Sequence, residues 1–297
     1  MFCYAMGRRL ALHHSAEFKL DLSVYREGSD TRKAGLEAFR RKVGLDLLNT
    51  SAAEASPEEV AALRDDSMAL TQRVRRRLGR ALGRPSTHFV EQGYRFDPAA
   101  LSAPNPSYTD GFWQSEKYFA DIADTIRQEF APRDHTVLTY AEAYVARLKE
   151  QCGGRLVALH VRRGDLAFAQ EKLKDLSLVH GAPVSLDYIY RAIAEFDATT
   201  HFLVFSDSGP DLQWCRDNIK ADRLHFSEGH SDIHDLTIMS RCDHNILANS
   251  TFSWWAAWLN PNPAKRVIAP TVWATQKSAE KTFMVTDDLI PPNWTLL

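Results

Sequence analysis

Short apolar runs alternate with amphipathic segments in the second half of the chain. The apolar runs have the length of buried strands and cover 156–161, 201–206, 223–226, 245–250 and 266–270. The segments between them carry apolar residues at helical spacing, at 187–196, 209–219 and 231–242. Strands that alternate with helices predict an α/β domain with a parallel sheet, and such sheets bind ligands at the carboxyl ends of their strands.

The first half of the chain is mainly helical in pattern. Residues 1–14 and 140–151 have helical spacing, and residues 17–25 are predicted to form a short strand that leads into a loop. Another helix is predicted to begin after Ser56, because Ser56 can cap it and Pro57 suits its first position.

Length and composition indicate a globular protein of two domains. The chain has 297 residues, and about 150 is usual for one domain. The change of pattern near residue 150 divides it into domains 1–150 and 151–297. Hydrophobic residues make up 44% and charged residues 25%, which excludes a disordered or collagen-like chain. The formal net charge of −2 gives no reason to expect nucleic acid or an anionic membrane as a partner.

The cysteines and the hydropathy pattern indicate a reducing compartment. Cys3, Cys152, Cys215 and Cys242 form no CxxC pair, so we expect reduced thiols that are mostly buried. No apolar run approaches the roughly 18 residues of a spanning helix, and the first residues lack a secretory signal. We therefore expect a protein of the cytoplasm, or one peripheral to the inner membrane face.

The segment His160-Val161-Arg162-Arg163-Gly164-Asp165 follows the first predicted strand of the second half. At the carboxyl edge of a parallel sheet, an arginine can hold a pair of phosphate oxygens in two-point contact. The glycine would let the backbone approach that ligand closely. The alternative is an arginine–aspartate salt bridge that closes the loop, which contributes little if it is exposed.

Two further strand ends carry polar side chains. Asn249-Ser250-Thr251 ends one predicted strand and begins a helix, and free N–H groups there favour an anion. Ordinary helix capping explains the same hydroxyls. Asp207, in the FSDS segment, lies at another strand end and is a second candidate. Three tryptophans of the following helix are expected in the core rather than as a platform for a sugar: Trp254, Trp255 and Trp258.

The sequence predicts no metal or nucleotide cofactor. His230, Asp232, His234 and Asp235 match no zinc signature, and there is no DxD pair for a divalent ion. The fingerprints GxGxxG, GxxxxGK[ST] and GxSxG are also absent from the sequence.

The sequence resembles the bacterial-type alpha-1,2-fucosyltransferases, which are inverting, metal-independent glycosyltransferases that use GDP-fucose. Three motifs carry the resemblance: HVRRGD at 160–165, FSDS at 205–208 and MSRCDHNILANSTFSWWAAWLNPNP at 239–263. The last is highly specific, whereas HxRR is shared with alpha-1,6- and protein O-fucosyltransferases. The resemblance implies a GT-B-like α/β fold with two Rossmann-like domains facing a cleft. The acceptor would belong to the N-terminal domain, and the nucleotide sugar to the C-terminal domain.

The resemblance also implies roles for individual residues. Arg162 would hold the diphosphate and stabilise the leaving group, and His160 would lie against the nucleotide. Asp235 takes the place of a carboxylate that recognises guanine. Asp165 is a candidate for the general base, and Glu116 is another. The full set implied to bind GDP-fucose is His160, Arg162, Arg163, Asp207, Asp235, Asn249, Ser250 and Thr251.

The implied reaction is transfer of L-fucose from GDP-fucose to O-2 of a galactose-containing oligosaccharide. Two alternatives remain open. Fucose could be transferred to another hydroxyl or to protein. The chain could also be a non-catalytic remnant that binds GDP or a glycan, because the family usually opens with a strand and a GGLGNQ-type turn and this sequence begins at Met1-Phe2.

Overall fold

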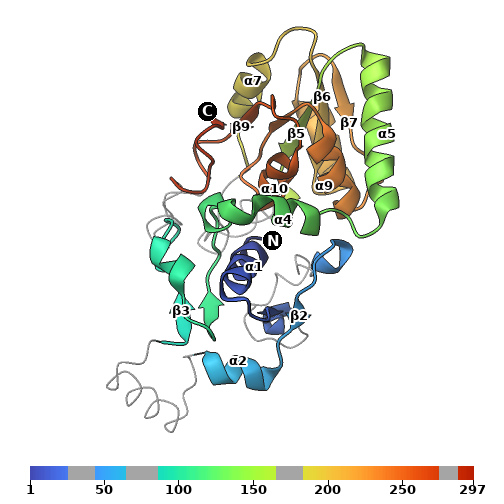
Figure 1. The fold of residues 1–297 in the computed structure, drawn as a ribbon. Coiled ribbons are helices and arrows are strands. Elements are labelled where there is room, and N and C mark those ends of the chain that lie inside the picture. The colour runs from blue at the N-terminus through green and yellow to red at the C-terminus, as the bar shows by residue number, and fades with distance from the viewer. Residues whose placement is uncertain (26–43, 65–85, 165–182, 274–286) are drawn as a thin grey trace. The chain divides into compact units, whose positions relative to one another are not determined.

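The computed structural model describes residues 1–25, 44–64, 86–164, 183–273 and 287–297. The chain divides into two compact units (Figure 1). The first comprises residues 1–129 with 285–289, and the second comprises 130–284 with 290–297. Each unit is described by itself below.

The second unit contains a six-stranded sheet in which every strand pair is parallel. The strand order is β10-β9-β8-β5-β6-β7. The strands are β5 (Leu156–Val161), β6 (His201–Ser206), β7 (Leu224–Phe226), β8 (His244–Ile246), β9 (Val267–Ala269) and β10 (Thr295–Leu296). All six residues of β5 are buried, as expected for a strand covered on both faces. The structure therefore confirms the α/β class that the sequence predicted.

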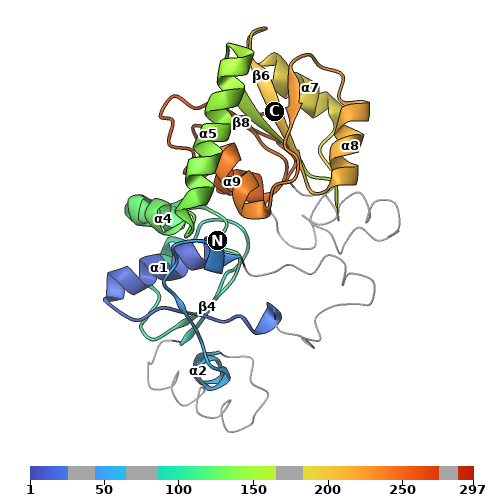
Figure 2. The same ribbon diagram turned by 90° about the vertical axis from the view of Figure 1, so that its right-hand side faces the viewer.

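Helices cover both faces of this sheet. They are α5 (His135–Cys152), α7 (Leu186–Ala194), α8 (Gly209–Asn218), α9 (Asp232–Arg241) and α10 (Thr251–Leu259). Val157 and Leu159 of β5 share one hydrophobic core with Tyr188 of α7 and Leu212 of α8. Helices α5 and α9 pack against each other on the opposite face (Figure 2).

The tryptophans of α10 lie in the core of this unit. Trp254 is 0% exposed, Trp255 2% and Trp258 5%. Trp254 also contacts Trp294 near the C-terminus, with ring centroids 5.4 Å apart. The prediction that these rings are core residues is therefore confirmed.

The first unit is built around α1 (Phe2–His14), whose buried face carries apolar and aromatic residues. Two side chains of α1 contact the end of α4 (Ala123–Glu129). The Tyr4 hydroxyl and the Arg8 guanidinium each donate a hydrogen bond of 2.7 Å to the Glu129 carboxylate. The first unit also contains two parallel strand pairs: β1 (Lys19–Leu20) with β2 (Ala53–Glu54), and β3 (His88–Val90) with β4 (Tyr108–Asp110).

The helix predicted after Ser56 is present as α2 (Pro57–Leu63). The Ser56 hydroxyl accepts a hydrogen bond from the Glu59 N–H, while the Glu59 carboxylate accepts one from the Ser56 N–H, which is a capping box. Short 3₁₀ helices are η1 (Ser23–Tyr25), η3 (Leu45–Leu47), η4 (Pro98–Ser102), η5 (Glu116–Tyr118) and η6 (Ala120–Ile122).

Two sequence expectations differ from the structure, and one strand was not expected. The units divide between Glu129 and Phe130 rather than near residue 150, because α5 packs against α9 and β5 of the second unit. The strand expected at 17–25 is reduced to the two residues of β1. Strand β10 was not predicted, because its two exposed residues carry no buried-strand pattern.

The thiols are also less uniformly buried than expected. Cys215 and Cys242 are buried, Cys152 is half-buried and Cys3 is exposed. In the described ranges, no helix combines the length and apolar character needed to cross a membrane.

Candidate functional site

The strand order reverses at β5, which creates a switch point in the sheet. From β5 the chain proceeds to β6 and β7 on one side, and then crosses to β8 and β9 on the other. The loops that leave the carboxyl ends of β5 and β8 therefore diverge, and α/β sheets bind ligands in the crevice that this creates.

The two segments singled out from the sequence meet at this switch point. His160 lies near the end of β5, and Phe252 lies in the first turn of α10, after β8. Their ring centroids are 5.9 Å apart. The HVRRGD segment thus neighbours the helix that Asn249-Ser250-Thr251 begins, although some 90 residues separate them in the chain. Sequence reasoning selected both segments, and the structure brings them together.

The electrostatic environment keeps His160 neutral. Burial, together with the positive charge of Arg162, lowers the pKa of His160 to about 3. Within the described residues, its buried Nδ1 has no hydrogen-bond partner. A buried polar atom without a partner is costly, so it marks a place where a bound ligand or a change of conformation would supply one.

The two arginines of the motif differ in their surroundings. The guanidinium of Arg163 lies over the Trp214 ring of α8, with its central carbon 3.5 Å from the ring centroid. Its Nε is 3.9 Å from the Asp211 carboxylate of the same helix. The Arg163 side chain is thus held against α8 by a cation–π contact and a nearby opposite charge.

Arg162 is half-buried and lies directly beyond the last residue of β5. Its charge is close enough to His160 to depress the imidazole pKa.

Trp214 and Asp211, which contact Arg163, were not singled out from the sequence. They lie one helical turn apart in a helix that follows the FSDS strand end, which is the pattern that could have identified them.

Asp207 shapes the backbone of the motif. Its Oδ2 accepts a hydrogen bond of 2.7 Å from the backbone N–H of Arg163. A Cβ atom on Gly164 would lie 3.1 Å from the same oxygen and 3.2 Å from the Asp207 Cβ. A side chain at this position would therefore crowd Asp207, and the glycine lets the backbone of the motif lie close to that carboxylate.

The hydroxyl-bearing turn caps α10 as predicted. The Ser250 hydroxyl is 3.3 Å from the Phe252 N–H and accepts its hydrogen bond. Thr251 is the first residue of the helix and is half-buried. The Asn249 amide donates to the Trp273 carbonyl oxygen at 3.3 Å and so links the turn to the segment after β9.

Asp235 lies in the first turn of α9 and is mostly buried. Its Oδ1 accepts a hydrogen bond from the Ser227 hydroxyl at 2.7 Å, and the His230 Nδ1 lies 3.6 Å away. Burial raises the pKa of Asp235 to about 6, so its carboxyl changes charge in a range where most aspartates are fully ionised. Tyr140 of α5 contacts the other ring nitrogen of His230 at 2.8 Å.

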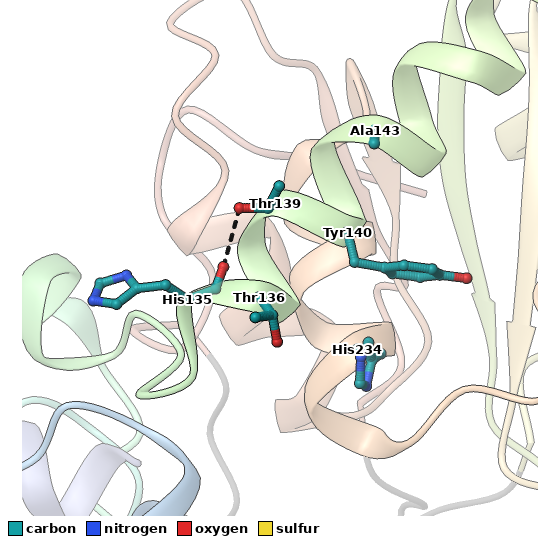
Figure 3. Close-up of a pocket in the computed structure, with 6 residues that line it drawn as sticks. All are labelled: His135, Thr136, Thr139, Tyr140, Ala143 and His234. Carbon is teal, nitrogen blue, oxygen red and sulfur yellow. Dashed lines mark hydrogen bonds between the residues drawn. The ribbon is translucent and has the colours of Figure 1, made fainter.

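A hollow lies between α5 and α9, lined by His135, Thr136, Thr139, Tyr140, Ala143 and His234 (Figure 3). The Thr139 hydroxyl donates to the carbonyl oxygen of His135 on its edge. Its lining includes no predicted site residue, but Tyr140 connects it to His230 and hence to Asp235.

The two candidate bases are placed differently. Asp165 lies outside the described residues. Glu116 begins η5 in the first unit, where Ser115 caps the turn.

The sequence predicted no metal site at His230, Asp232, His234 and Asp235. In the described part of the chain, the potential metal ligands that converge are other residues.

A parallel sheet with basic and hydroxyl-bearing segments at its switch point is typical of α/β proteins that bind nucleotides. The family model for glycosyl transferase family 11 matches residues 88–297. The chain belongs to glycosyl transferase family 11.

Several characterised proteins are similar to this chain. The Alpha-1,2-colitosyltransferase of Escherichia coli is 34% identical over 55% of this chain and 54% of its own length. The Galactoside alpha-(1,2)-fucosyltransferase 1 of Saimiri boliviensis boliviensis is 31% identical over 50% of this chain and 42% of its own length. The chain thus spans about half the length of these relatives.

Among solved structures, the fucosyltransferase NodZ from Bradyrhizobium is 15% identical and matches 88% of each chain, with a TM-score of 0.42.

Proposed function

We propose that this chain transfers L-fucose from GDP-fucose to O-2 of a galactoside, with inversion at the anomeric carbon and without a catalytic metal ion. The observation that carries the proposal is the meeting of the HVRRGD segment and the start of α10 at the switch point, where His160 and Phe252 are in ring contact. The names of the relatives, which describe alpha-1,2 transfer, support the linkage.

The proposed reaction is a single displacement. The acceptor O-2 attacks C1 of fucose, the bond from C1 to the β-phosphate oxygen breaks, and GDP leaves with the bonding electrons. Arg162 and the N–H groups at the start of α10 stabilise the charge that develops on GDP. A general base takes the proton of the acceptor hydroxyl. Asp165 and Glu116 remain the candidates for that base.

Within this site the other predicted residues take distinct roles. His160, neutral at pH 7, offers a ring nitrogen to the nucleotide, and Ser250 and Thr251 face the phosphates through the turn that they form. Asp235 accepts hydrogen bonds from guanine. Arg163, Asp207 and Asn249 act indirectly, because their contacts with Trp214, the Arg163 backbone and the Trp273 carbonyl hold the shape of the loops.

GDP-colitose is a second candidate donor. Colitose is fucose without its 3-hydroxyl, and a relative that is 34% identical is named a colitosyltransferase. A site built to bond the 3-hydroxyl would discriminate strongly against GDP-colitose, whereas a site that leaves it uncontacted would accept both donors.

Product analysis tests the proposal. The protein is incubated with GDP-fucose or GDP-colitose and a β-galactoside, with and without EDTA, and the product linkage is determined by NMR. We expect an alpha link to O-2 and unchanged turnover in EDTA. A 6-linked or peptide product would refute the acceptor assignment. GDP binding without any turnover would favour the non-catalytic alternative.

Asp235 gives a prediction about pH. If its carboxylate accepts hydrogen bonds from guanine, GDP must bind to the ionised form, so affinity rises as the pH increases from 5 to 7 through the pKa of about 6. Asp235→Asn should weaken binding at pH 7 about tenfold, since a hydrogen bond to a charged group is lost. Isothermal titration calorimetry across this range measures both effects.

The variant also serves as the control, because the terminal phosphate of GDP ionises in the same pH range. Asp235→Asn retains the phosphate contribution, as well as that of the His230 imidazole beside the carboxyl. Any difference between the pH profiles of GDP affinity for the wild type and the variant therefore comes from the Asp235 carboxyl. Parallel profiles for both proteins would show that this carboxyl does not contact the base.

A further inference from the structure

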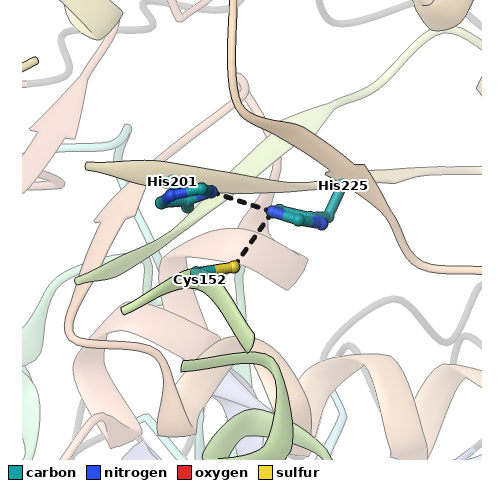
Figure 4. Close-up of side chains that lie close together, drawn as sticks. All are labelled: Cys152, His201 and His225. Carbon is teal, nitrogen blue, oxygen red and sulfur yellow. Dashed lines mark hydrogen bonds between the residues drawn. The ribbon is translucent and has the colours of Figure 1, made fainter. Parts of the chain in front are cut away.

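Three side chains with metal-binding atoms converge at the amino edge of the large sheet, opposite to the switch point. Cys152 is the last residue of α5, His201 is the first residue of β6, and His225 lies in the middle of β7 (Figure 4). The ligand atoms of all three lie within 4.8 Å of one another. Cys152 precedes His225 by 73 residues and His201 precedes it by 24, so no short sequence motif links the three residues.

The sheet register places the two histidines on one face. His225 pairs with Leu203 across the β6–β7 ladder, and His201 precedes Leu203 by two residues. Since side chains alternate along a strand, His201 and Leu203 point to the same side as His225. Phe202 and Leu224, of the opposite parity, belong to the core beneath α7 and α8. The two histidines therefore lie on the face opposite to α7 and α8. Helix α5 packs on that same face, and Cys152 at its end lies beside the two histidines.

Hydrogen bonding alone satisfies this cluster poorly. The His225 Nε2 atom is 3.2 Å from the Cys152 Sγ and 3.0 Å from the His201 Nδ1. A neutral imidazole nitrogen carries either one proton or one lone pair, so Nε2 can form a good hydrogen bond with only one of these neighbours. A cation bound among the three atoms would accept a lone pair from each of them.

The distances fit a tetrahedral ion. Zinc bonds of about 2.3 Å to sulfur and 2.0–2.1 Å to nitrogen place neighbouring ligand atoms about 3.4–3.6 Å apart. The two separations from His225 Nε2, 3.2 Å to Cys152 Sγ and 3.0 Å to His201 Nδ1, are within about half an ångström of that spacing, and the third pair of ligand atoms lies within 4.8 Å. Rotations of these half-buried side chains can close the difference. We propose that Cys152, His201 and His225 form a binding site for a zinc-like divalent transition metal, with the fourth position open to water.

The chemistry of the ligands selects the ion. One thiolate and two imidazoles suit Zn²⁺ or Co²⁺, whereas Mg²⁺ and Ca²⁺ require oxygen ligands. A bound ion would tie the end of α5 to β6 and β7, so its role is stabilisation rather than catalysis.

Cobalt titration of the metal-free protein tests the site. We expect saturation at one Co²⁺ per chain, with visible d–d bands of a tetrahedral ion and a near-ultraviolet thiolate-to-cobalt band. Cys152→Ser should abolish the thiolate band and weaken binding at least tenfold. His201→Ala and His225→Ala should each weaken it at least tenfold. Cys3→Ser, which removes an exposed thiol elsewhere, should leave the spectrum unchanged.

The wild-type spectrum is decisive even if a variant fails to fold. A wild-type protein without the thiolate band, or a band that survives in Cys152→Ser, would overturn the proposal. Zinc should also raise the Tm of the wild type and not that of Cys152→Ser, while Mg²⁺ should change neither. The result is independent of fucosyl transfer, because the ligands lie at the opposite edge of the sheet from Arg162.

Discussion

Arg162→Ala is expected to weaken GDP binding by about 100-fold or more and to lower kcat/KM further. The guanidinium lies just beyond β5 at the switch point, where it can form charge-assisted, two-point contacts with a diphosphate. Removing one well-placed donor to a developing charge costs about 3–4 kcal/mol, which corresponds to 10²- to 10³-fold. Calorimetry with GDP and steady-state kinetics with GDP-fucose measure the two effects.

Arg155→Ala is the matched control for that variant. Arg155 immediately precedes β5, so its replacement removes the same charge from the opposite end of the same strand. If Arg155→Ala weakened GDP binding as much as Arg162→Ala, the effect would come from general charge. Unchanged GDP affinity in Arg162→Ala would mean that the nucleotide binds elsewhere, and the proposed function would lose its supporting site.

Arg163→Ala separates the roles of the two neighbouring arginines. Its side chain is engaged by Trp214 and faces Asp211, so we expect a smaller loss of GDP affinity than in Arg162→Ala, together with a lower Tm. Circular dichroism melting and calorimetry measure this difference. If Arg163→Ala lost GDP binding as completely as Arg162→Ala at an unchanged Tm, Arg163 would contact the diphosphate directly and its role as a structural residue would be wrong.

The parallel sheet was predictable because its central strands are buried on both faces. Segments such as 156–161 and 201–206 are continuous apolar runs, and the polar residues that end them must gather at one edge once the strands are parallel. That argument sufficed to select Arg162 and Asp207. It also selected Ser250, because a hydroxyl before an apolar helical segment indicates a cap.

Side-chain partners between distant segments were not predictable in the same way. The contact of Arg163 with Trp214 and the burial of Asp235 beside Ser227 depend on how loops from different strands pack. Periodicity specifies the face on which a residue lies, but not its neighbour from another element. The convergence of Cys152 with two histidines is the strongest example, because its members come from a helix end and two strands.

Trp254→Ala is expected to lower the free energy of unfolding by about 3–5 kcal/mol and the Tm by roughly 10 °C. The Trp254 ring is 0% exposed and lies against three other tryptophans of the second unit: Trp255, Trp258 and Trp294. Truncation would leave a cavity among rigid rings that cannot collapse into it. Urea unfolding followed by circular dichroism measures the loss.

Trp254→Phe is the matched control, since it keeps an aromatic ring in the same space and should cost much less. The pair of variants also decides between the two roles considered for these rings. A core ring affects stability and leaves the acceptor KM of the folded enzyme nearly unchanged. If Trp254→Ala instead kept the wild-type Tm and raised only the acceptor KM, the ring would be a platform for a sugar. Its complete burial makes the first outcome the expected one, because a ring without exposed surface offers no face for a sugar to stack on.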